Sequence, residues 1–264
     1  MTTTVTVEEH DTPLILSLPH SGPALPIGMR DRLTDIARAL PDTDWHIDRL
    51  YAFAELLPAT TVTAVFSRYV IDVNRDPAGT SLYPGQPTTG LVPTTTAAGD
   101  PLYRAGEEPD DAEIEARKRT YFAAYHDALG EQIERVKARH GLALLYDCHS
   151  IKSRVPRLFE GELPALNLGS NDGRSCAPAL QEALEAKMAE SPYTRVTNGR
   201  FKGGWITRHY GQPHDNVHAV QMELAQRTYM HEDPPYAYDH DKAQALQPTL
   251  LRFLETMLAF GEKS

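Results

Sequence analysis

Short apolar runs separated by longer amphipathic segments are the main pattern along this chain. Runs rich in leucine, isoleucine and valine that are bounded by proline, glycine or polar residues are typical of buried strands. We expect strands at residues 14–18, 60–66, 69–73, 142–146, 194–197 and 217–224. Strands that alternate with helices indicate an α/β fold with three layers, α/β/α, around a mixed, mostly parallel sheet.

Four longer segments carry apolar residues at helical spacing with polar residues between them, which predicts helices that each bury one face. They cover residues 44–57, 110–140, 174–189 and 242–260. Residues 76–109 are instead dense in proline, glycine and threonine, and a long irregular segment of this kind is typical of either a lid over a functional site or a disordered segment. Because no repeat or composition break divides the chain, we expect a single domain over residues 1–264.

Composition narrows the classes of protein to which this chain can belong. Its 264 residues are 41% hydrophobic and 23% charged, as in globular domains, and no apolar run approaches the roughly 20 residues that cross a bilayer. The net charge of −10 opposes binding to nucleic acid and anionic membranes. The N-terminus lacks the pattern of a secretory signal, and two cysteines are too few for a disulfide framework. We therefore expect a cytoplasmic protein that acts on a small molecule.

Two of the 11 histidines, His20 and His149, come at the ends of apolar strands, and each precedes a serine. Ligands of open α/β sheets bind beyond the carboxyl ends of the strands. A catalytic zinc ion takes about three protein ligands, usually histidines and a carboxylate, and keeps one position open for water. We expect these histidines to hold zinc with Asp44 or Asp48. The alternative is that both merely form hydrogen bonds in loops.

A charged residue within an apolar strand is costly unless it is paired or functional. Glu223 lies between Met222 and Leu224 in such a strand. A metal-dependent hydrolase needs a carboxylate that accepts a proton from water and delivers it again. Glu223 is our candidate for this general base, and the alternative is a solvent-facing residue on an edge strand.

Basic residues gather in three groups although the protein is acidic. Arg68 and Arg75 flank the expected strand 69–73, and the planar fork of arginine suits bidentate binding of a carboxylate. Structural ion pairs of these arginines with Asp72 or Asp76 are the alternative. The groups together predict a small acidic substrate. The other two consist of Arg154 and Arg157, and of Arg200, Lys202 and Arg208.

Six short blocks occur in order along the chain. They are Pro-His-Ser-Gly at 19–22, Asp-Thr-Asp-Trp-His at 42–46, Ser-Arg-Tyr-Val-Ile-Asp-Val-Asn-Arg at 67–75, Ser-Leu-Tyr-Pro-Gly-Gln at 81–86, Asp-Cys-His-Ser at 147–150 and Lys-Gly-Gly-Trp-Ile-Thr-Arg at 202–208. Together they resemble the N-formylglutamate amidohydrolase family. The resemblance implies a zinc-carboxypeptidase-like (phosphorylase/hydrolase-like) fold related to that of aspartoacylase.

The resemblance also implies roles for individual residues. His20 and His149 would be metal ligands, with Asp44 favoured over Asp48 as the third, because Pro23 stands where the wider group has a glutamate ligand. One divalent metal ion, Zn²⁺, would be bound per chain. The other implied roles are Glu223 as general base, Arg68 as a donor to the developing oxyanion, and Asn74, Arg75, Arg208, Arg154 and Tyr83 as substrate-binding residues.

The implied reaction is hydrolysis of N-formyl-L-glutamate to formate and L-glutamate, at the end of a histidine degradation route. Water would attack the formyl carbon, Glu223 would accept its proton, and the leaving nitrogen would receive it. Another N-acyl amino acid, such as N-formyl- or N-acetyl-aspartate, is the alternative substrate. A metal-free carboxylate-binding protein is the alternative of a different class, since it would use the same arginines without needing His20, His149 and Glu223.

Overall fold

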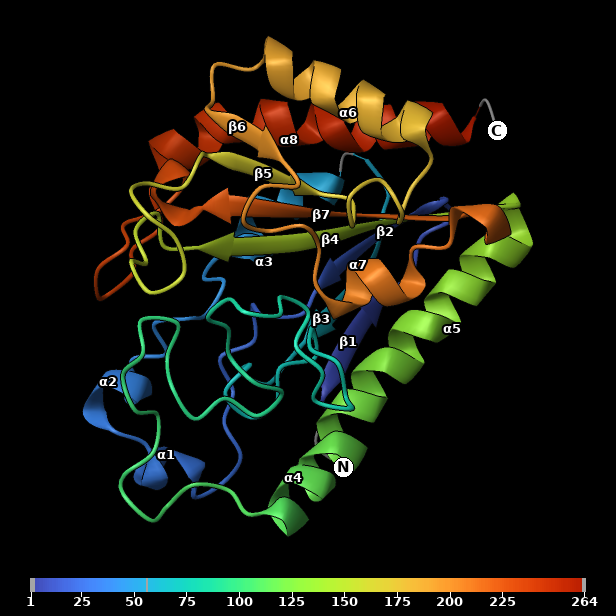
Figure 1. Cartoon of the computed structure of the whole chain (residues 1–264). Helices are drawn as coiled ribbons and strands as arrows, with labels where there is room; N and C mark the ends of the chain where they lie inside the picture. The colour runs from blue at the N-terminus through green and yellow to red at the C-terminus, as the bar shows by residue number, and fades with distance from the viewer. Residues whose placement is uncertain (1–2, 56, 263–264) are drawn as a thin grey trace.

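A seven-stranded sheet forms the centre of the computed structural model, which describes residues 3–55 and 57–262 (Figure 1). The strand order is β1-β3-β2-β4-β7-β5-β6. Only the pairs β1 with β3 and β5 with β7 are antiparallel, so the sheet is mixed and mostly parallel, as predicted. The strands are β1 Val5–Glu8, β2 Leu14–Leu18, β3 Thr60–Ala64, β4 Ala143–Ile151, β5 Leu166–Gly169, β6 Arg195–Thr197 and β7 Val217–Ala225.

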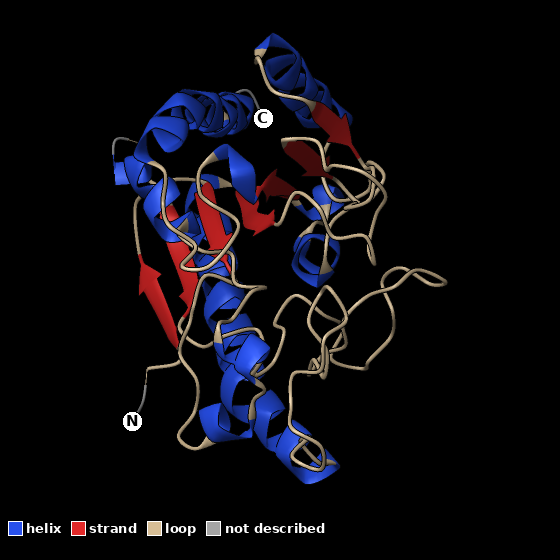
Figure 2. Cartoon of the chain, turned by 90° about the vertical axis from the view of Figure 1, so that its left-hand side faces the viewer, coloured by secondary structure: helices blue, strands red, loops and turns tan. Residues whose placement is uncertain are grey.

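Helices cover both faces of this sheet (Figures 1 and 2). On one face, α8 packs against Leu144 and Tyr146 of β4 and α6 packs beside α8, while α5 packs against the neighbouring Leu145 on the other face. Side chains of a strand point alternately to the two faces, so a fully buried strand is apolar throughout. The three-layer α/β/α fold is confirmed. The α-helices are α1 Met29–Arg32, α2 Asp35–Arg38, α3 Ile47–Leu50, α4 Asp111–Arg117, α5 Ala123–His140, α6 Pro178–Glu190, α7 Trp205–Tyr210 and α8 His240–Gly261.

The long helix predicted over residues 110–140 is present, with a π-helical turn, Lys118–Phe122, between α4 and α5. The helix predicted over residues 44–57 is wrong for most of its length. Leaving aside residue 56, which lies outside the described residues, only α3 and a short 3-10 helix, Ala52–Glu55, form there. His46, which precedes α3, has a left-handed backbone with φ of 62° and therefore cannot lie within a helix.

Two strand predictions need correction. Residues 69–73 form turns, not a strand, because the Asp72 amide bonds to Leu91 of the irregular segment and Tyr69 packs with Met29 and Leu33 away from the sheet. Strand β4 continues to Ile151 and thus includes His149, which we had placed beyond it. The short strands β1 and β5 were not predicted.

Residues 76–109 contain no helix and no strand. The segment lies beside the α1 and α2 region, on the opposite side of the sheet's centre from α6 and α8 (Figure 1). None of the helices within the described residues is long and apolar enough to cross a membrane.

Candidate active site and metal centre

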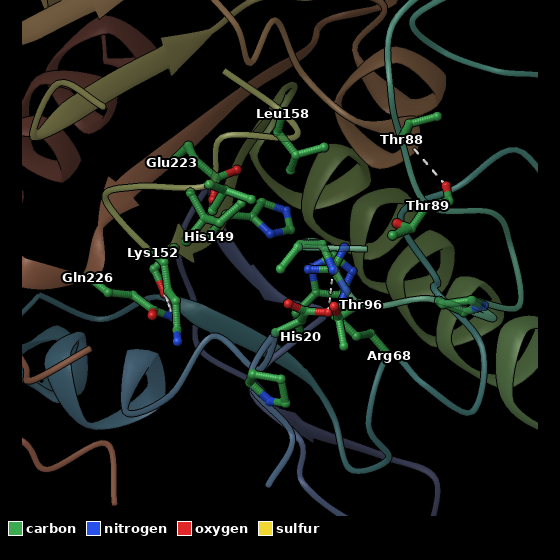
Figure 3. Close-up of a pocket in the computed structure, with 18 of the residues that line it drawn as sticks. His20, Arg68, Thr88, Thr89, Thr96, His149, Lys152, Leu158, Glu223 and Gln226 are labelled. Carbon is green, nitrogen blue, oxygen red and sulfur yellow. Dashed lines mark hydrogen bonds between the residues drawn. The ribbon is translucent and has the colours of Figure 1, made fainter. Parts of the chain in front are cut away.

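A cavity of about 450 Å³ opens where the carboxyl ends of β2, β4 and β7 meet. Its lining includes His20, just beyond β2, His149 on β4 and Glu223 on β7 (Figure 3). Residues of the irregular segment 76–109 form another part of the wall. The cavity has the size of a small-molecule site, and it occupies the end of the sheet at which α/β proteins bind ligands.

His20, Asp44 and His149 meet in this cavity and are all buried. Each offers one potential ligand atom, and these atoms lie within 4.8 Å of one another. Asp44 Oδ2 is 3.1 Å from His149 Nδ1 and 3.8 Å from His20 Nδ1. Asp48 is exposed on α3 and lies outside the group. Of the two aspartates, the structure therefore places Asp44 beside the histidines.

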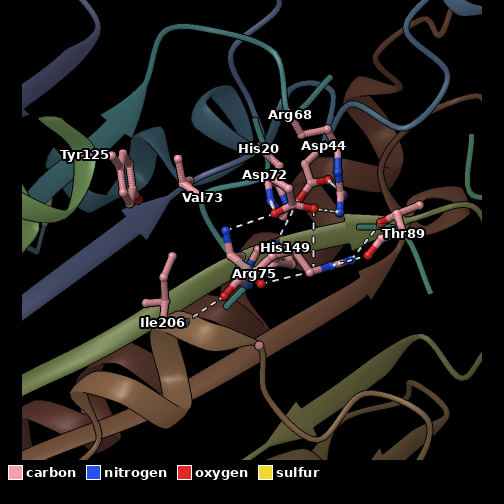
Figure 4. A network of polar contacts seen from close by, with 12 residues as sticks. His20, Asp44, Arg68, Asp72, Val73, Arg75, Thr89, Tyr125, His149 and Ile206 are labelled. Carbon is pink, nitrogen blue, oxygen red and sulfur yellow. Dashed lines mark hydrogen bonds and ion pairs between the residues drawn. The ribbon is translucent and has the colours of Figure 1, made fainter. Parts of the chain in front are cut away.

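A second carboxylate contacts each histidine ring, and Figure 4 shows the one beside His20, which is Asp72. Asp72 Oδ1 lies 2.7 Å from His20 Nε2, and Asp147 Oδ2 lies 2.9 Å from His149 Nε2. We assign the N–H of each ring to Nε2, which leaves both Nδ1 atoms directed at Asp44. His20 Nδ1 and Asp44 Oδ1 are buried without a hydrogen-bond partner in the structure. Imidazoles anchored by carboxylates and orphaned lone pairs fit a divalent metal ion.

The surroundings of His20 keep its ring in the neutral form that a metal ligand requires. Burial would raise the pKa of Asp72, but the guanidinium groups of Arg68 and Arg75 outweigh burial and hold that pKa well below its ordinary value. Burial and Arg68 lower the pKa of His20 to about 4. The ring is therefore neutral at physiological pH, as a histidine ligand must be.

His149 has the opposite electrostatic balance. Burial disfavours its charged form, yet the carboxylates of Asp147 and Asp44 outweigh burial and raise the pKa of His149 well above its ordinary value. A proton and a metal ion would therefore compete for this ring. Metal binding there would release the proton.

Glu223 lies beside His149 on the neighbouring strand. The parallel pairing of β4 and β7 sets these two residues at the same register, and Glu223 is only 7% exposed. Since β7 runs between β4 and β5, the alternative of a solvent-facing edge residue is wrong. Burial, strengthened by Asp44 and opposed by His149, raises the pKa of Glu223 to about 8. A carboxyl group that titrates near neutral pH suits proton transfer.

Arg68, Asn74 and Arg75 all line the cavity. Arg68 forms an ion pair with Asp72 at 2.7 Å, which is the structural alternative considered for this residue. It also lines the cavity. The Asn74 side chain is fixed because its Oδ1 accepts a hydrogen bond from the Ile206 amide at 2.8 Å and its Nδ2 donates to Asp147 Oδ2 at 3.3 Å. A Cβ on Gly204 would lie 2.3 Å from this Asn74 amide, so only glycine fits there.

The remaining predicted substrate-binding residues are distributed differently. Tyr83 lines the cavity, and Arg154 does so from the rim, where it is 65% exposed and paired with Glu162. Arg208 is not among the lining residues. It donates to the carbonyls of Gly203 and Leu82, and its guanidinium lies 4.9 Å from the centre of the Tyr83 ring. Arg208 therefore supports Tyr83 from behind, and its contact with substrate stays a prediction.

Arginines from other parts of the chain hold the irregular segment 76–109 over the cavity. Each donates to a main-chain carbonyl of that segment. The pairs are Arg75 with Thr89, Arg157 with Thr96, Arg200 with Pro87 and Arg208 with Leu82. Of the cavity residues, Lys152 and Gln226 were missed by sequence reasoning, and Arg200 was noted only as a member of a basic group.

Asp72 supports several parts of the site at once, and Asp72→Asn is expected to destabilise the fold. The carboxylate is 0% exposed, contacts His20 and Arg68, and accepts a hydrogen bond from the Asn74 amide. Removing one partner of a buried ion pair leaves an uncompensated charge, so we expect the free energy of unfolding to fall by about 3–5 kcal/mol in urea denaturation. Asp76→Asn, in the neighbouring half-buried turn, keeps the side-chain oxygen that accepts from the Ala78 amide and should change it by about 0.5 kcal/mol or less. Equal effects of both variants would contradict this role.

Comparison with known proteins agrees with this geometry. Residues 12–230 match the family model of N-formylglutamate amidohydrolase. The chain is 51% identical to the N-formylglutamate deformylase of Pseudomonas aeruginosa over 252 residues, which are 95% of this chain and 94% of that protein. It is 48% identical to the N-formylglutamate deformylase of Pseudomonas putida over 250 residues, 94% and 93% of the two chains.

A solved structure is similar over almost the whole chain. The N-formylglutamate amidohydrolase of Ralstonia eutropha JMP134 matches with a TM-score of 0.79 and 27% sequence identity, covering 98% of this chain and 97% of that one. The family that the six sequence blocks indicated is therefore confirmed. The chain belongs to the N-formylglutamate amidohydrolase family and is a hydrolase that acts on an amide bond.

Proposed function

We propose that the protein hydrolyses N-formyl-L-glutamate to formate and L-glutamate with the help of one divalent metal ion per chain, Zn²⁺. The observation that carries this proposal is the meeting of His20, Asp44 and His149, with two orphaned lone pairs, next to the buried Glu223. The relatives from the two Pseudomonas species, which are N-formylglutamate deformylases, support the choice of substrate.

The chain's own residues divide the work of the reaction. When bound, the metal ion supplies Lewis acidity, which polarises a carbonyl oxygen and lowers the pKa of water. Glu223 accepts a proton from the water that attacks the formyl carbon and delivers it to the departing nitrogen of glutamate. Arg68, which is paired with Asp72 and lines the cavity, donates a hydrogen bond to the oxyanion that develops on the formyl oxygen.

The α-carboxylate of the substrate is held by residues next to His149. Arg75 and the fixed Asn74 line the cavity next to His149, and we assign them to the α-carboxylate of the substrate. Tyr83 and the segment 76–109 cover the site and exclude water from it.

We infer that the reaction ends a histidine degradation route in the cytoplasm, and that residues 1–264 act as one domain. Support for a reducing compartment comes from Cys148 and Cys176, which are both buried and unpaired. The single sheet that joins strands from both ends of the chain supports the one-domain organisation.

A formate-release assay across three substrates tests this proposal. We expect N-formyl-L-glutamate to have a higher kcat/KM than N-formyl-L-aspartate or N-acetyl-L-glutamate. Better turnover of the aspartate or the acetyl compound would instead support the alternative of an amidohydrolase for another N-acyl amino acid. The acetyl compound is followed by acetate release under the same conditions.

A further inference from the structure

Among the described residues, five cationic side chains line the cavity, and four of them already have partners. These four are arginines, and each donates to a carboxylate or to a main-chain carbonyl of the protein. The pairs are Arg68 with Asp72, Arg75 with Thr89, Arg154 with Glu162, and Arg200 with Pro87 and Leu158.

Lys152 is the exception. Its ammonium group lies 5.5 Å from the centre of the Tyr236 ring and has no hydrogen bond or ion pair with any residue in the described part of the chain. Asp42 also lines the cavity, but its Oδ2 accepts hydrogen bonds from the Tyr69 hydroxyl and the Ala97 amide, both at 2.8 Å, and it forms no ion pair with Lys152. A half-buried ammonium with three unused donors can take up an anion without breaking an existing pair.

The backbone brings Lys152 close to the reaction centre. It follows Ile151, the last residue of β4, and therefore stands three residues beyond His149, or about 10 Å along the chain. Figure 3 shows Lys152 and Gln226 on one side of the two histidines, and Thr89 on the other. Arg75 is bonded to Thr89 at 3.0 Å, so two cations flank the centre from different sides.

This arrangement matches the shape of the substrate in the proposed function, on which the inference rests. In N-formyl-L-glutamate the α-carboxylate is attached directly to the carbon that bears the scissile nitrogen. The side-chain carboxylate lies two methylene groups farther away and can point to the other side. A site for both needs two separated cations, and the long, flexible arm of lysine suits the more distant group.

We propose that Lys152 binds the side-chain carboxylate of the substrate and thereby determines the preference for glutamate. Its ammonium group turns from Tyr236 towards that carboxylate and forms a charge-assisted hydrogen bond. Arg75 and Asn74 keep the α-carboxylate. Lys152 is in this view a specificity-determining residue that takes no part in proton transfer.

The test compares N-formyl-L-glutamate with N-formyl-L-glutamine, which has the same shape without the negative charge. For Lys152→Met, we expect the ratio of kcat/KM for the two substrates to fall by about 10- to 100-fold relative to the wild type, the range expected for a hydrogen bond between charged groups. The loss should appear mainly as a higher KM for N-formyl-L-glutamate. Lys152→Arg keeps the charge and should retain part of the preference.

Lys187→Met is the matched control, because Lys187 lies on α6 outside the cavity and pairs with Glu190 at 3.0 Å. It should leave the ratio unchanged. The inference is overturned if Lys152→Met keeps the wild-type ratio, or if it lowers kcat equally for both substrates. Absence of formate release from N-formyl-L-glutamate by the wild-type protein would overturn the proposed function as well, so the two failures are distinguishable.

Discussion

Glu223→Gln is expected to lower kcat by about 100- to 10,000-fold while the protein keeps its fold and its metal ion. Glutamine has nearly the same shape as glutamate but cannot accept a proton from water, and the loss corresponds to that of a general base. Glu223 sits beside His149 without belonging to the cluster of potential ligands, so metal binding should persist. Formate release, metal content and thermal unfolding are measured on the same preparation.

Glu185→Gln on α6 makes the same chemical change away from the cavity and should retain wild-type turnover. Two results would remove Glu223 from its role. One is turnover near the wild-type rate in Glu223→Gln, and the other is loss of the metal together with activity, which would indicate a ligand instead.

Glu223→Gln, which lowers activity, should raise the stability of the fold relative to the wild type as the pH rises. The ordinary pKa of a glutamate is 4.5, and burial raises that of Glu223 to about 8, so the folded protein binds a proton that the unfolded chain has released. Between these two values, rising pH therefore lowers the free energy of unfolding of the wild type. Glutamine does not ionise. Urea denaturation of the chelator-treated proteins should show Glu223→Gln gaining on the wild type as the pH rises from 5 to 8, a window set by the two pKa values.

Asp44→Ala is expected to lose the metal ion and, with it, activity. Removing even an outer partner of a metal ligand costs about 10- to 100-fold in affinity, so loss of the ligand itself should exceed about 100-fold. Asp44 is 1% exposed and lies between the two histidines, whereas Asp48 is exposed on α3. Metal content after dialysis should therefore fall in Asp44→Ala only. Loss of metal in Asp48→Ala, or its retention in Asp44→Ala, would show that the ligand set is wrong.

The sequence predicted the layered fold and the place of the site because both follow from simple periodicities. Strands buried on both faces are apolar throughout, and parallel strands bring their carboxyl ends to one edge. His20, His149 and Glu223 were found by their positions near such ends. The same rule misplaced the end of β4, since a strand continues as long as a neighbour pairs with it, and β7 pairs with β4 as far as Ile151.

Segment 69–73 shows why an apolar run alone does not make a strand. Tyr69 and Val70 are buried, as the sequence indicates, but they pack into a separate cluster with Leu33 and Leu102. Their backbone bonds to loops because Asp72 must reach His20 and two arginines. The contacts of Asp72 in the site determine the local backbone there. Strand propensity, which reflects only the residue types in the segment, does not predict such contacts.

Side-chain direction in loops was the other unpredictable element. Arg200 and Arg208 are close in sequence, yet Arg200 lines the cavity and Arg208 supports Tyr83 from behind. Both donate to carbonyls of the irregular segment, and those partners are set only when distant loops meet. Lys152 drew no attention in the sequence because a single lysine after a strand is ordinary. Its significance comes from the absence of a partner in the described structure.

The most direct test of a metal-dependent deformylase at His20, Asp44 and His149 is formate release from N-formyl-L-glutamate by the purified protein through a cycle of metal removal and return. Metal content is measured at each stage. The account predicts about one zinc ion per chain, loss of formate release in step with loss of the ion, and recovery when zinc is restored. Undiminished formate release from protein that contains no metal would contradict it.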